Sequence, residues 1–240
     1  MAIKILFFGD SITFGLKDKE KGGWIERIRS RFLNLSNPAT LKENCEETFW
    51  YNLGVPSENT DGLRHRLANE LQARVFKKEQ PIVVFNYGIN DAVIHKNKNW
   101  VPLEYFKRNL VEAIQLAQDA NAKVLLMTMI PIADFVDNKI NQYQQQISNQ
   151  DLARYAELTL QIAQQSNCES LDLFQTFNEA LKLLSADRSG NFSTDFLAGF
   201  YANDGIHPND GGHQILADLI YPVLINLIND NLTNNVQLRY

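Results

Sequence analysis

Short apolar runs alternate with stretches of helical periodicity along most of this chain, and this alternation constrains the fold more than any other feature. Runs with the length of a buried strand fall at residues 3–8, 49–53, 82–87 and 124–130, with a weaker one at 170–174. Apolar residues with helical spacing follow at residues 24–35, 63–71, 103–117, 152–163 and 215–227. Fully apolar strands separated by helices form a parallel sheet covered on both faces. The pattern therefore predicts an α/β protein.

A single domain of residues 1–240 is the organisation that the sequence favours. By length alone, 240 residues could form one large α/β domain or two small ones. No internal repeat occurs in the sequence, and no stretch has the composition of a linker. The glutamine-rich residues 142–146 are interpreted as the solvated start of a helix rather than as a low-complexity segment.

Charge and cysteine content narrow the partners and the compartment. The formal net charge is −5, which gives no electrostatic reason to expect binding to nucleic acid or to an anionic membrane surface. No run reaches the roughly 18 apolar residues of a membrane span. Cys45 and Cys168 lie far apart and lack the spacing of a metal or redox site, which indicates reduced thiols. Because the apolar run at Ile3 leaves no room for a signal peptide, the sequence predicts a cytoplasmic protein.

Residues suited to nucleophilic catalysis lie near both ends of the chain. Ser11 follows the first apolar run, so we expect it at the edge of the sheet where ligands bind in α/β folds. Taken alone, Ser11 could equally be a turn serine or a helix cap. Asp204 and His207 precede Pro208, which keeps His207 out of helical geometry and allows both side chains to project to one side. A serine nucleophile needs such a base, and the base needs a carboxylate to orient it.

Two other strand ends offer hydrogen-bond donors for the oxyanion that forms when an acyl carbon is attacked. Gly54 follows the second apolar run, and a glycine allows the backbone to approach a ligand closely, so its N–H group is a candidate donor. Asn90 follows the third run and supplies a side-chain amide. Each would be an ordinary turn residue by itself, but both are expected beside Ser11.

Four blocks of the sequence resemble those of the GDSL hydrolases, also called SGNH hydrolases. Residues 9–12, Gly-Asp-Ser-Ile, look like the first block, with isoleucine in place of the usual leucine. Residues 52–55, 88–91 and 204–212 look like the second, third and last blocks. The blocks occur in family order, and the resemblance covers nearly the whole chain.

The resemblance implies a three-layer α/β/α sandwich with a flavodoxin-like, five-stranded parallel sheet. It also implies an esterase or lipase that cleaves a carboxylic ester or thioester of a small molecule or lipid through an acyl-enzyme, without cofactor or metal. Ser11 would be the nucleophile, His207 the general base, and Asp204 the residue that orients His207. The N–H groups of Ser11 and Gly54 and the amide of Asn90 would form the oxyanion hole.

The sequence departs from the family pattern in the second block. A second glycine that is common there is absent, and Pro56 and Ser57 occupy the turn. This departure bears on the position of the Gly54 N–H group.

Two alternative functions fit the same scaffold. Ser11, Thr13 and Gly15 could cradle a phosphate after the first strand, as in a flavodoxin-like mononucleotide-binding protein. That interpretation gives no role to Asn90 or His207. A non-catalytic binding module is the second alternative, because a fold alone does not imply a function.

The sequence leaves the substrate open. Short acyl esters, lysophospholipids, acyl thioesters and acetylated sugars are all handled by proteins of the family that this chain resembles. Aromatic residues occur in segments 131–147 and 185–203, near the expected site. These segments could line the substrate pocket or could only pack on the core. The oligomeric state is likewise not predicted.

Overall fold

The structure is a computed structural model that describes residues 3–35, 48–76, 79–186, 188 and 190–237, with side chains described as far as residue 230 except that of Leu35. Cys45 lies outside the described residues. Cys168 is a half-buried free thiol. Burial raises the pKa of this thiol to about 11, so it is protonated at neutral pH.

Five parallel strands form the central sheet, as predicted. Their order across the sheet is β2 (Thr48–Gly54), β1 (Ile3–Gly9), β3 (Ile82–Asn86), β6 (Lys123–Met127) and β8 (Glu169–Leu171). Every residue of β1 and β3 is buried, which explains their continuous apolar runs. β8 is shorter than predicted, because Asp172 caps the helix that begins at Leu173.

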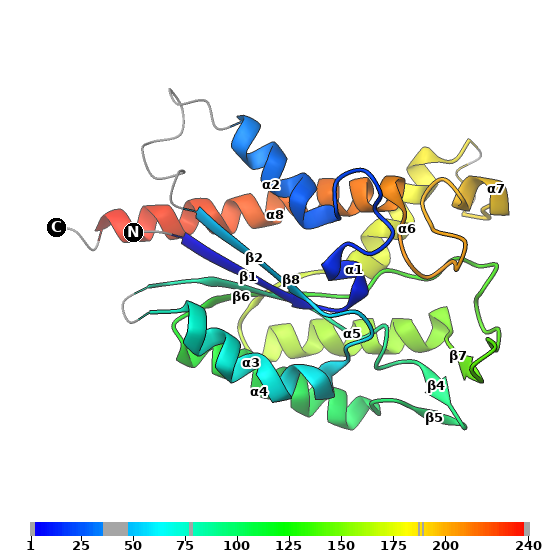
Figure 1. Cartoon of the computed structure of the whole chain (residues 1–240), viewed down its shortest axis with the longest axis horizontal. Helices are drawn as coiled ribbons and strands as arrows, with labels where there is room; N and C mark the ends of the chain where they lie inside the picture. The colour runs from blue at the N-terminus through cyan, green and yellow to red at the C-terminus, as the bar shows by residue number, and fades with distance from the viewer. Residues whose placement is uncertain (1–2, 36–47, 77–78, 187, 189, 238–240) are drawn as a thin grey trace.

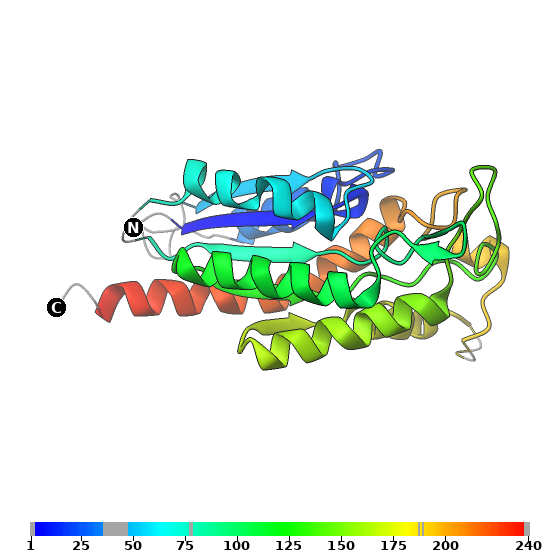
Figure 2. The same ribbon diagram turned by 90° about the horizontal axis from the view of Figure 1, so that it is seen from below.

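Helices cover both faces of the sheet, which gives the predicted three layers (Figure 1). On one face lie α2 (Trp24–Leu35), α6 (Leu173–Leu184) and α8 (Asp210–Gln237), and α8 contacts the other two. Figure 2 shows the other face, with α3 (Thr60–Arg74), α4 (Leu103–Asp119) and α5 (Asn149–Gln165) side by side. The buried stripes of these helices, such as Ile25, Ile28 and Phe32 of α2, complete the core.

Within the part of the chain that the structure describes, one helix has the length and composition that a membrane span requires. It is the stretch Asp210–Asp230 of α8. In this fold, Ile220, Leu224 and Ile228 of that stretch are fully buried, and the helix packs against α2 and α6. The apolar character of α8 is therefore accounted for by the core.

A small antiparallel sheet, which the sequence did not predict, stands at the carboxyl end of the main sheet. It consists of β5 (Lys98–Asn99), β4 (Ile94–His95) and β7 (Gln145–Gln146), in that order. The prediction that residues 142–146 start a helix was wrong, because β7 pairs with β4 and α5 begins only at Asn149. Two short helices, α1 (Ser11–Phe14) and α7 (Thr194–Leu197), lie at the same end of the molecule (Figure 1).

Candidate active site

Ser11 is the first residue of α1, directly beyond the end of β1. The carboxylate of Asp10 accepts a hydrogen bond from the backbone N–H of Ile12 at 2.9 Å and caps this single turn. Gly15 ends the turn with a positive φ of 94°, a conformation that favours glycine. These local contacts place the Ser11 side chain at the carboxyl edge of the sheet, where α/β folds bind ligands.

The turn that carries Asp204 and His207 is organised around the Asp204 carboxylate. Its Oδ1 accepts hydrogen bonds from the backbone N–H groups of Ile206 and His207 at 3.0 and 2.9 Å, and its Oδ2 lies 3.0 Å from His207 Nδ1. Burial alone would raise the pKa of Asp204, but these hydrogen bonds lower it to about 2. Asp204 is therefore ionised over the neutral range and can hold the Nδ1–H tautomer of His207.

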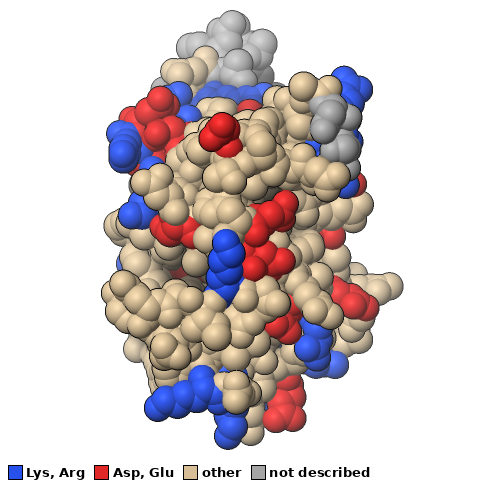
Figure 3. All heavy atoms as spheres, turned by 90° about the vertical axis from the view of Figure 1, so that its right-hand side faces the viewer, with Lys and Arg blue, Asp and Glu red and all other residues tan. Residues whose placement is uncertain are grey.

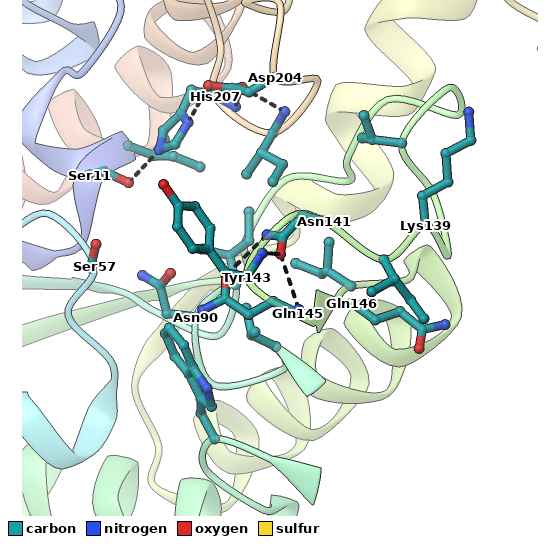
Figure 4. A pocket seen from close by; sticks show the side chains of 18 residues that line it. Ser11, Ser57, Asn90, Lys139, Asn141, Tyr143, Gln145, Gln146, Asp204 and His207 are labelled. Carbon is teal, nitrogen blue, oxygen red and sulfur yellow. Dashed lines mark hydrogen bonds and ion pairs between the residues drawn. The ribbon is translucent and has the colours of Figure 1, made fainter. Parts of the chain in front are cut away.

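Ser11 and His207 meet although 196 residues separate them in the sequence. The Ser11 Oγ and His207 Nε2 atoms are 2.8 Å apart, within hydrogen-bond distance (Figure 4). With Asp204 behind the imidazole ring, the three side chains form a continuous chain of hydrogen bonds. This is the geometry of a serine whose proton can pass to an oriented base.

A second set of contacts beside this site joins residues 18–27 to residues 210–214. The carboxylate of Asp210 accepts hydrogen bonds from the backbone N–H groups of Lys19 and Glu20, at 2.6 and 3.0 Å. Asp18 forms an ion pair with Arg27, whose guanidinium also donates to Gln214 at 2.9 Å. These contacts tie the loop after α1 to the start of α8, and they fix Ser11 relative to His207.

A cavity of about 490 Å³ opens over the Ser11–His207 pair. Asn90 lines it, and its amide Nδ2 donates to the backbone carbonyl of Glu58 at 2.9 Å. Ser57 also lines it, with a positive φ of 66° that is uncommon for a non-glycine residue. The apolar part of the lining comes from the following residues: Ile12, Ile89, Val93, Trp100, Val136, Ile140, Tyr143, Ile147 and Ile206.

Gly54 does not line this cavity. Its N–H group donates to the side chain of Asn52 at 3.0 Å. A Cβ atom at Gly54 would lie 2.3 Å from the backbone nitrogen of Phe14, so the glycine allows α1 to pack against the end of β2. Gly54 therefore makes the close approach that the sequence suggested, but it approaches the backbone of α1 and not a ligand. The structure brings Ser11, Asn90, Asp204 and His207 together, and it places Ser57 rather than Gly54 beside them.

The sequence left open whether segments 131–147 and 185–203 line the substrate pocket, and the structure distinguishes the two. Residues 136, 139–141, 143 and 145–147 of segment 131–147 line the cavity. The described residues of segment 185–203 contribute nothing to the lining; there, Phe196 packs on Phe192 and Phe200 with ring centroids 5.3 and 5.1 Å away. The first segment is therefore part of the site, whereas in the second the three phenylalanines pack on one another and Tyr201 packs on Phe177 of α6.

Comparison with known proteins now identifies the family. The sequence pattern of the GDSL-like lipase/acylhydrolase family matches residues 7–215. The chain belongs to this family. An isoamyl acetate-hydrolyzing esterase 1 homolog from Bos taurus is 24% identical over 92% of this chain and 81% of its own length. The GDSL assignment, and with it an enzyme that hydrolyses ester bonds, is confirmed.

Two solved structures share the fold. A lipase/acylhydrolase from Enterococcus faecalis superposes with a TM-score of 0.65, at 21% identity, over 93% of this chain and 95% of its own. A catalytic mutant of an acetylxylan esterase from Geobacillus stearothermophilus gives a TM-score of 0.63, at 20% identity, over 90% and 91% of the two chains. At these identities the likeness concerns the fold, and it confirms the predicted α/β/α architecture.

In this GDSL enzyme, the side chain of Glu58 anchors the turn that contains Ser57 to the neighbouring elements. The Glu58 carboxylate accepts hydrogen bonds from the Tyr87 hydroxyl at 2.6 Å and from Arg66 Nε at 2.7 Å. Arg66 also donates to the backbone carbonyl of Leu53 at 2.7 Å. Since the Glu58 side chain is almost fully buried, this network is shielded from water and fixes the end of β2. No periodic pattern in the sequence indicates this network.

Two buried carboxyl groups support the site without facing the cavity. Burial raises the pKa of Asp10 to about 6, against the lowering effect of the Ile12 N–H and the nearby His207. Burial likewise raises the pKa of Asp91 to about 7, although Asp91 Oδ1 accepts hydrogen bonds from the backbone N–H and the hydroxyl of Thr60. Asp91 therefore ties the start of α3 to the loop that carries Asn90. Among the described residues, no cluster of His, Cys, Asp and Glu has the arrangement of a metal site.

Proposed function

We propose that this GDSL family member is a serine carboxylesterase that works through an acyl-enzyme, with Ser11, His207 and Asp204 as its triad. The observation that carries the proposal is the continuous hydrogen bonding from Ser11 Oγ through the His207 ring to Asp204, at 2.8 and 3.0 Å. Asp204 is ionised and its carboxylate is fixed by two backbone N–H groups, so it can stabilise the imidazolium that forms when His207 takes the serine proton.

In this mechanism, Ser11 Oγ attacks the ester carbonyl while His207 Nε2 accepts the serine proton. The tetrahedral intermediate collapses, the carbon–oxygen bond to the alcohol breaks, and His207 returns the proton to the departing alkoxide. Water then attacks the acyl-enzyme with His207 again as the base, which releases the acid and regenerates Ser11. Each proton that leaves a nucleophile is thus returned to a leaving group.

The oxyanion is proposed to be stabilised by three donors around the cavity. The Ser11 N–H lies in the first turn of α1, where backbone N–H groups have no partner within the helix. The Asn90 amide uses one of its two hydrogens on the Glu58 carbonyl and has the second for the substrate. We assign the third donor to the backbone N–H of Ser57, in place of Gly54, because Ser57 lines the cavity and the Gly54 N–H is already bonded to Asn52.

The alternative of a mononucleotide-binding site finds little support in the geometry. Thr13, one of its three proposed phosphate ligands, is only 1% exposed and points into the protein. The positions of Asn90, Asp204 and His207 around one cavity would also have no role in phosphate binding. The predicted cytoplasmic location stays a prediction.

Hydrolysis of p-nitrophenyl acetate by Ser11→Ala tests the proposal. We expect the variant to keep its fold and to lose about 10⁴-fold or more in kcat, because no other group replaces the nucleophile. Ser30→Ala is the matched control, since Ser30 is an exposed serine on α2 that does not line the cavity. Circular dichroism checks that both variants are folded. Turnover by Ser11→Ala close to that of the wild type would rule out Ser11 as the nucleophile.

A further inference from the structure

Residues 137–147, here called the roof, form a hairpin over the cavity that is held by its own hydrogen bonds. The backbone N–H of Asn138 donates to the carbonyl of Ile147 at 2.9 Å, and that of Asn141 donates to Gln145 at 2.8 Å. β7 joins the roof to β4, on the loop that follows β3. The roof is therefore a built wall of the site, connected to the loop that carries Asn90.

The roof presents large apolar side chains that the core leaves uncovered. Ile140 and Tyr143 are 65% and 66% exposed, and both line the cavity. Figure 4 shows the Tyr143 side chain reaching from the roof toward Ser11 and His207. Trp100, which is 39% exposed, lines the same cavity. Exposed apolar side chains gathered around a catalytic group mark a binding surface, because water-exposed apolar area has no structural benefit there.

The polar side chains of the roof are engaged in holding it together. Asn141 Nδ2 donates to Gln145 Oε1 at 3.0 Å, and Asn141 Oδ1 accepts from the backbone N–H groups of Tyr143 and Gln145. Gln146 donates to the backbone carbonyl and the side chain of Asn138. These amides serve the hairpin, so the roof offers the cavity mainly carbon surface. A sugar, whose many hydroxyl groups need hydrogen-bond partners, is poorly matched to such a wall.

The charges around the cavity also disfavour phosphate-bearing esters. The structure describes every residue of the lining, and Lys139 is the one lysine or arginine among them. Figure 3 shows this end of the molecule, where the lysine and arginine side chains drawn lie in separate groups rather than in one continuous patch. Phosphates are usually recognised by paired cations or by arginine forks. The headgroup of a lysophospholipid or the nucleotide of an acyl-CoA has no such partner here.

We propose that the substrate is an ester with an apolar alkyl or small cyclic group, and that this group binds beneath the roof against Tyr143, Ile140 and Trp100. The inference rests on the proposed esterase function and names its substrate class. The cavity volume lies within the range of pockets that enclose a whole small ligand, so the group held there is larger than the methyl of an acetate. The group belongs either to the acid or to the alcohol of the ester.

Two substrate series distinguish the acid from the alcohol. The first holds the acid as acetate and lengthens the alcohol from methyl to hexyl; the second holds the alcohol as p-nitrophenol and lengthens the acid from acetate to hexanoate. We expect kcat/KM to rise about fourfold per methylene over the first steps of at least one series, the factor that corresponds to about 0.8 kcal/mol per buried CH₂. We expect an acetylated methyl xyloside to be hydrolysed more slowly than butyl acetate.

The roof variants connect this preference to Tyr143. Tyr143→Ala should lower kcat/KM for the preferred longest ester by about tenfold, whereas Tyr143→Phe, which keeps the ring, should retain it. Tyr105→Ala is the matched control, because Tyr105 is an exposed tyrosine on α4 that does not line the cavity. We expect this control to behave as the wild type in both series.

The outcomes separate this inference from the proposed function. Flat profiles in both series, or faster turnover of the acetylated xyloside, with activity that still depends on Ser11, would overturn the apolar substrate class and leave the esterase proposal standing. An unchanged preference in Tyr143→Ala would overturn the role of the roof. Absence of any turnover that depends on Ser11 would overturn the proposed function and this inference together.

Discussion

At the scale of single residues, the pKa values of three carboxyl groups close to the cavity shift in different directions: one is lowered and two are raised. Asp204 accepts hydrogen bonds from His207 and from two backbone N–H groups, so its pKa is lowered to about 2 although it is partly buried. Asp10 and Asp91 are fully buried, and burial raises their pKa values to about 6 and about 7. Asp204 accepts a hydrogen bond from the His207 ring and is ionised down to low pH, whereas the two groups with raised pKa values lie behind the site and take up protons as the pH falls to about 7 and about 6. This difference in pKa supports the proposed role of Asp204 as the carboxylate that stabilises a protonated His207.

The raised pKa of Asp91 predicts a pH dependence of stability. Between its ordinary value of 3.8 and the folded value of about 7, the unfolded chain has lost this proton and the folded protein keeps it. The contribution of Asp91 to the free energy of unfolding is therefore fully present below about pH 4 and is lost as the pH rises, by at most about 1.4 kcal/mol per pH unit. Asp91→Asn, which keeps an oxygen for Thr60, should remove this slope.

Urea unfolding at pH 4.5 and at pH 7.5 measures the effect. The wild type should lose stability relative to Asp91→Asn over this interval, while Asp195→Asn, at an exposed aspartate of α7, should follow the wild type. Parallel pH dependence in the wild type and in Asp91→Asn would show that Asp91 does not retain its proton in the fold.

At the scale of elements, the turn between β2 and α3 decides where the backbone donors point. The N–H of Val55 donates to the carbonyl of Gly9 and that of Glu58 to the carbonyl of Val55, at 2.9 and 3.0 Å. Ser57 adopts a positive φ in the turn, formed by Pro56 and Ser57, where the second glycine common in the family is absent. A non-glycine residue in this conformation costs free energy, and it persists only where the surroundings impose it. The buried network of Glu58, Arg66 and Tyr87 provides that constraint.

Glu58→Gln tests whether this network positions the oxyanion donors. The substitution removes the charge that pairs with Arg66, and it should let the Ser57 turn and the Asn90 amide shift. We expect kcat to fall by about 10²-fold, as for the loss of one oxyanion donor, with KM changed by less than about threefold. Glu112→Gln, at an exposed ion pair with Arg64, is the matched control and should retain activity.

Thermal unfolding of Glu58→Gln accompanies the kinetics, because breaking a buried ion pair costs about 3–5 kcal/mol of stability. The comparison is made well below the unfolding midpoint of the variant. A folded Glu58→Gln enzyme with wild-type kcat would contradict the positioning role, and a rise confined to KM would assign Glu58 to substrate binding instead.

At the scale of the whole molecule, the sequence predicts the main sheet and the catalytic side chains. It does not predict features that depend on backbone pairing or backbone orientation. The sheet was predictable because β1 and β3 are buried on both faces and are therefore apolar throughout. The small sheet was missed because strands of two residues have no periodicity, and the glutamines of β7 gain their structure from pairing with a distant segment. Ser57, which lines the cavity, was not selected because its side chain does not indicate which way its backbone N–H group points.

In the candidate site, too, the side chains could be predicted from the sequence and the backbone donor could not. Ser11, Asn90, Asp204 and His207 could be selected because their side chains have the required chemistry, and the fold brings all four to one cavity. Gly54 was selected for the close approach that a glycine allows, but that approach is made by α1 rather than by a ligand. The distinction depends on how α1 packs against β2, which is a tertiary contact.

The central claim is that Ser11 is a nucleophile activated by His207, and labelling with an alkyl fluorophosphonate tests it most directly. The Ser11 oxygen should bond to phosphorus as fluoride leaves, with the serine proton passing to His207. Peptide mass spectrometry should find a single adduct on the peptide that contains Ser11. Labelling should be absent in Ser11→Ala and slowed by at least about 10²-fold in His207→Ala. An adduct on another residue, or equal labelling rates in the wild type and His207→Ala, would contradict the account.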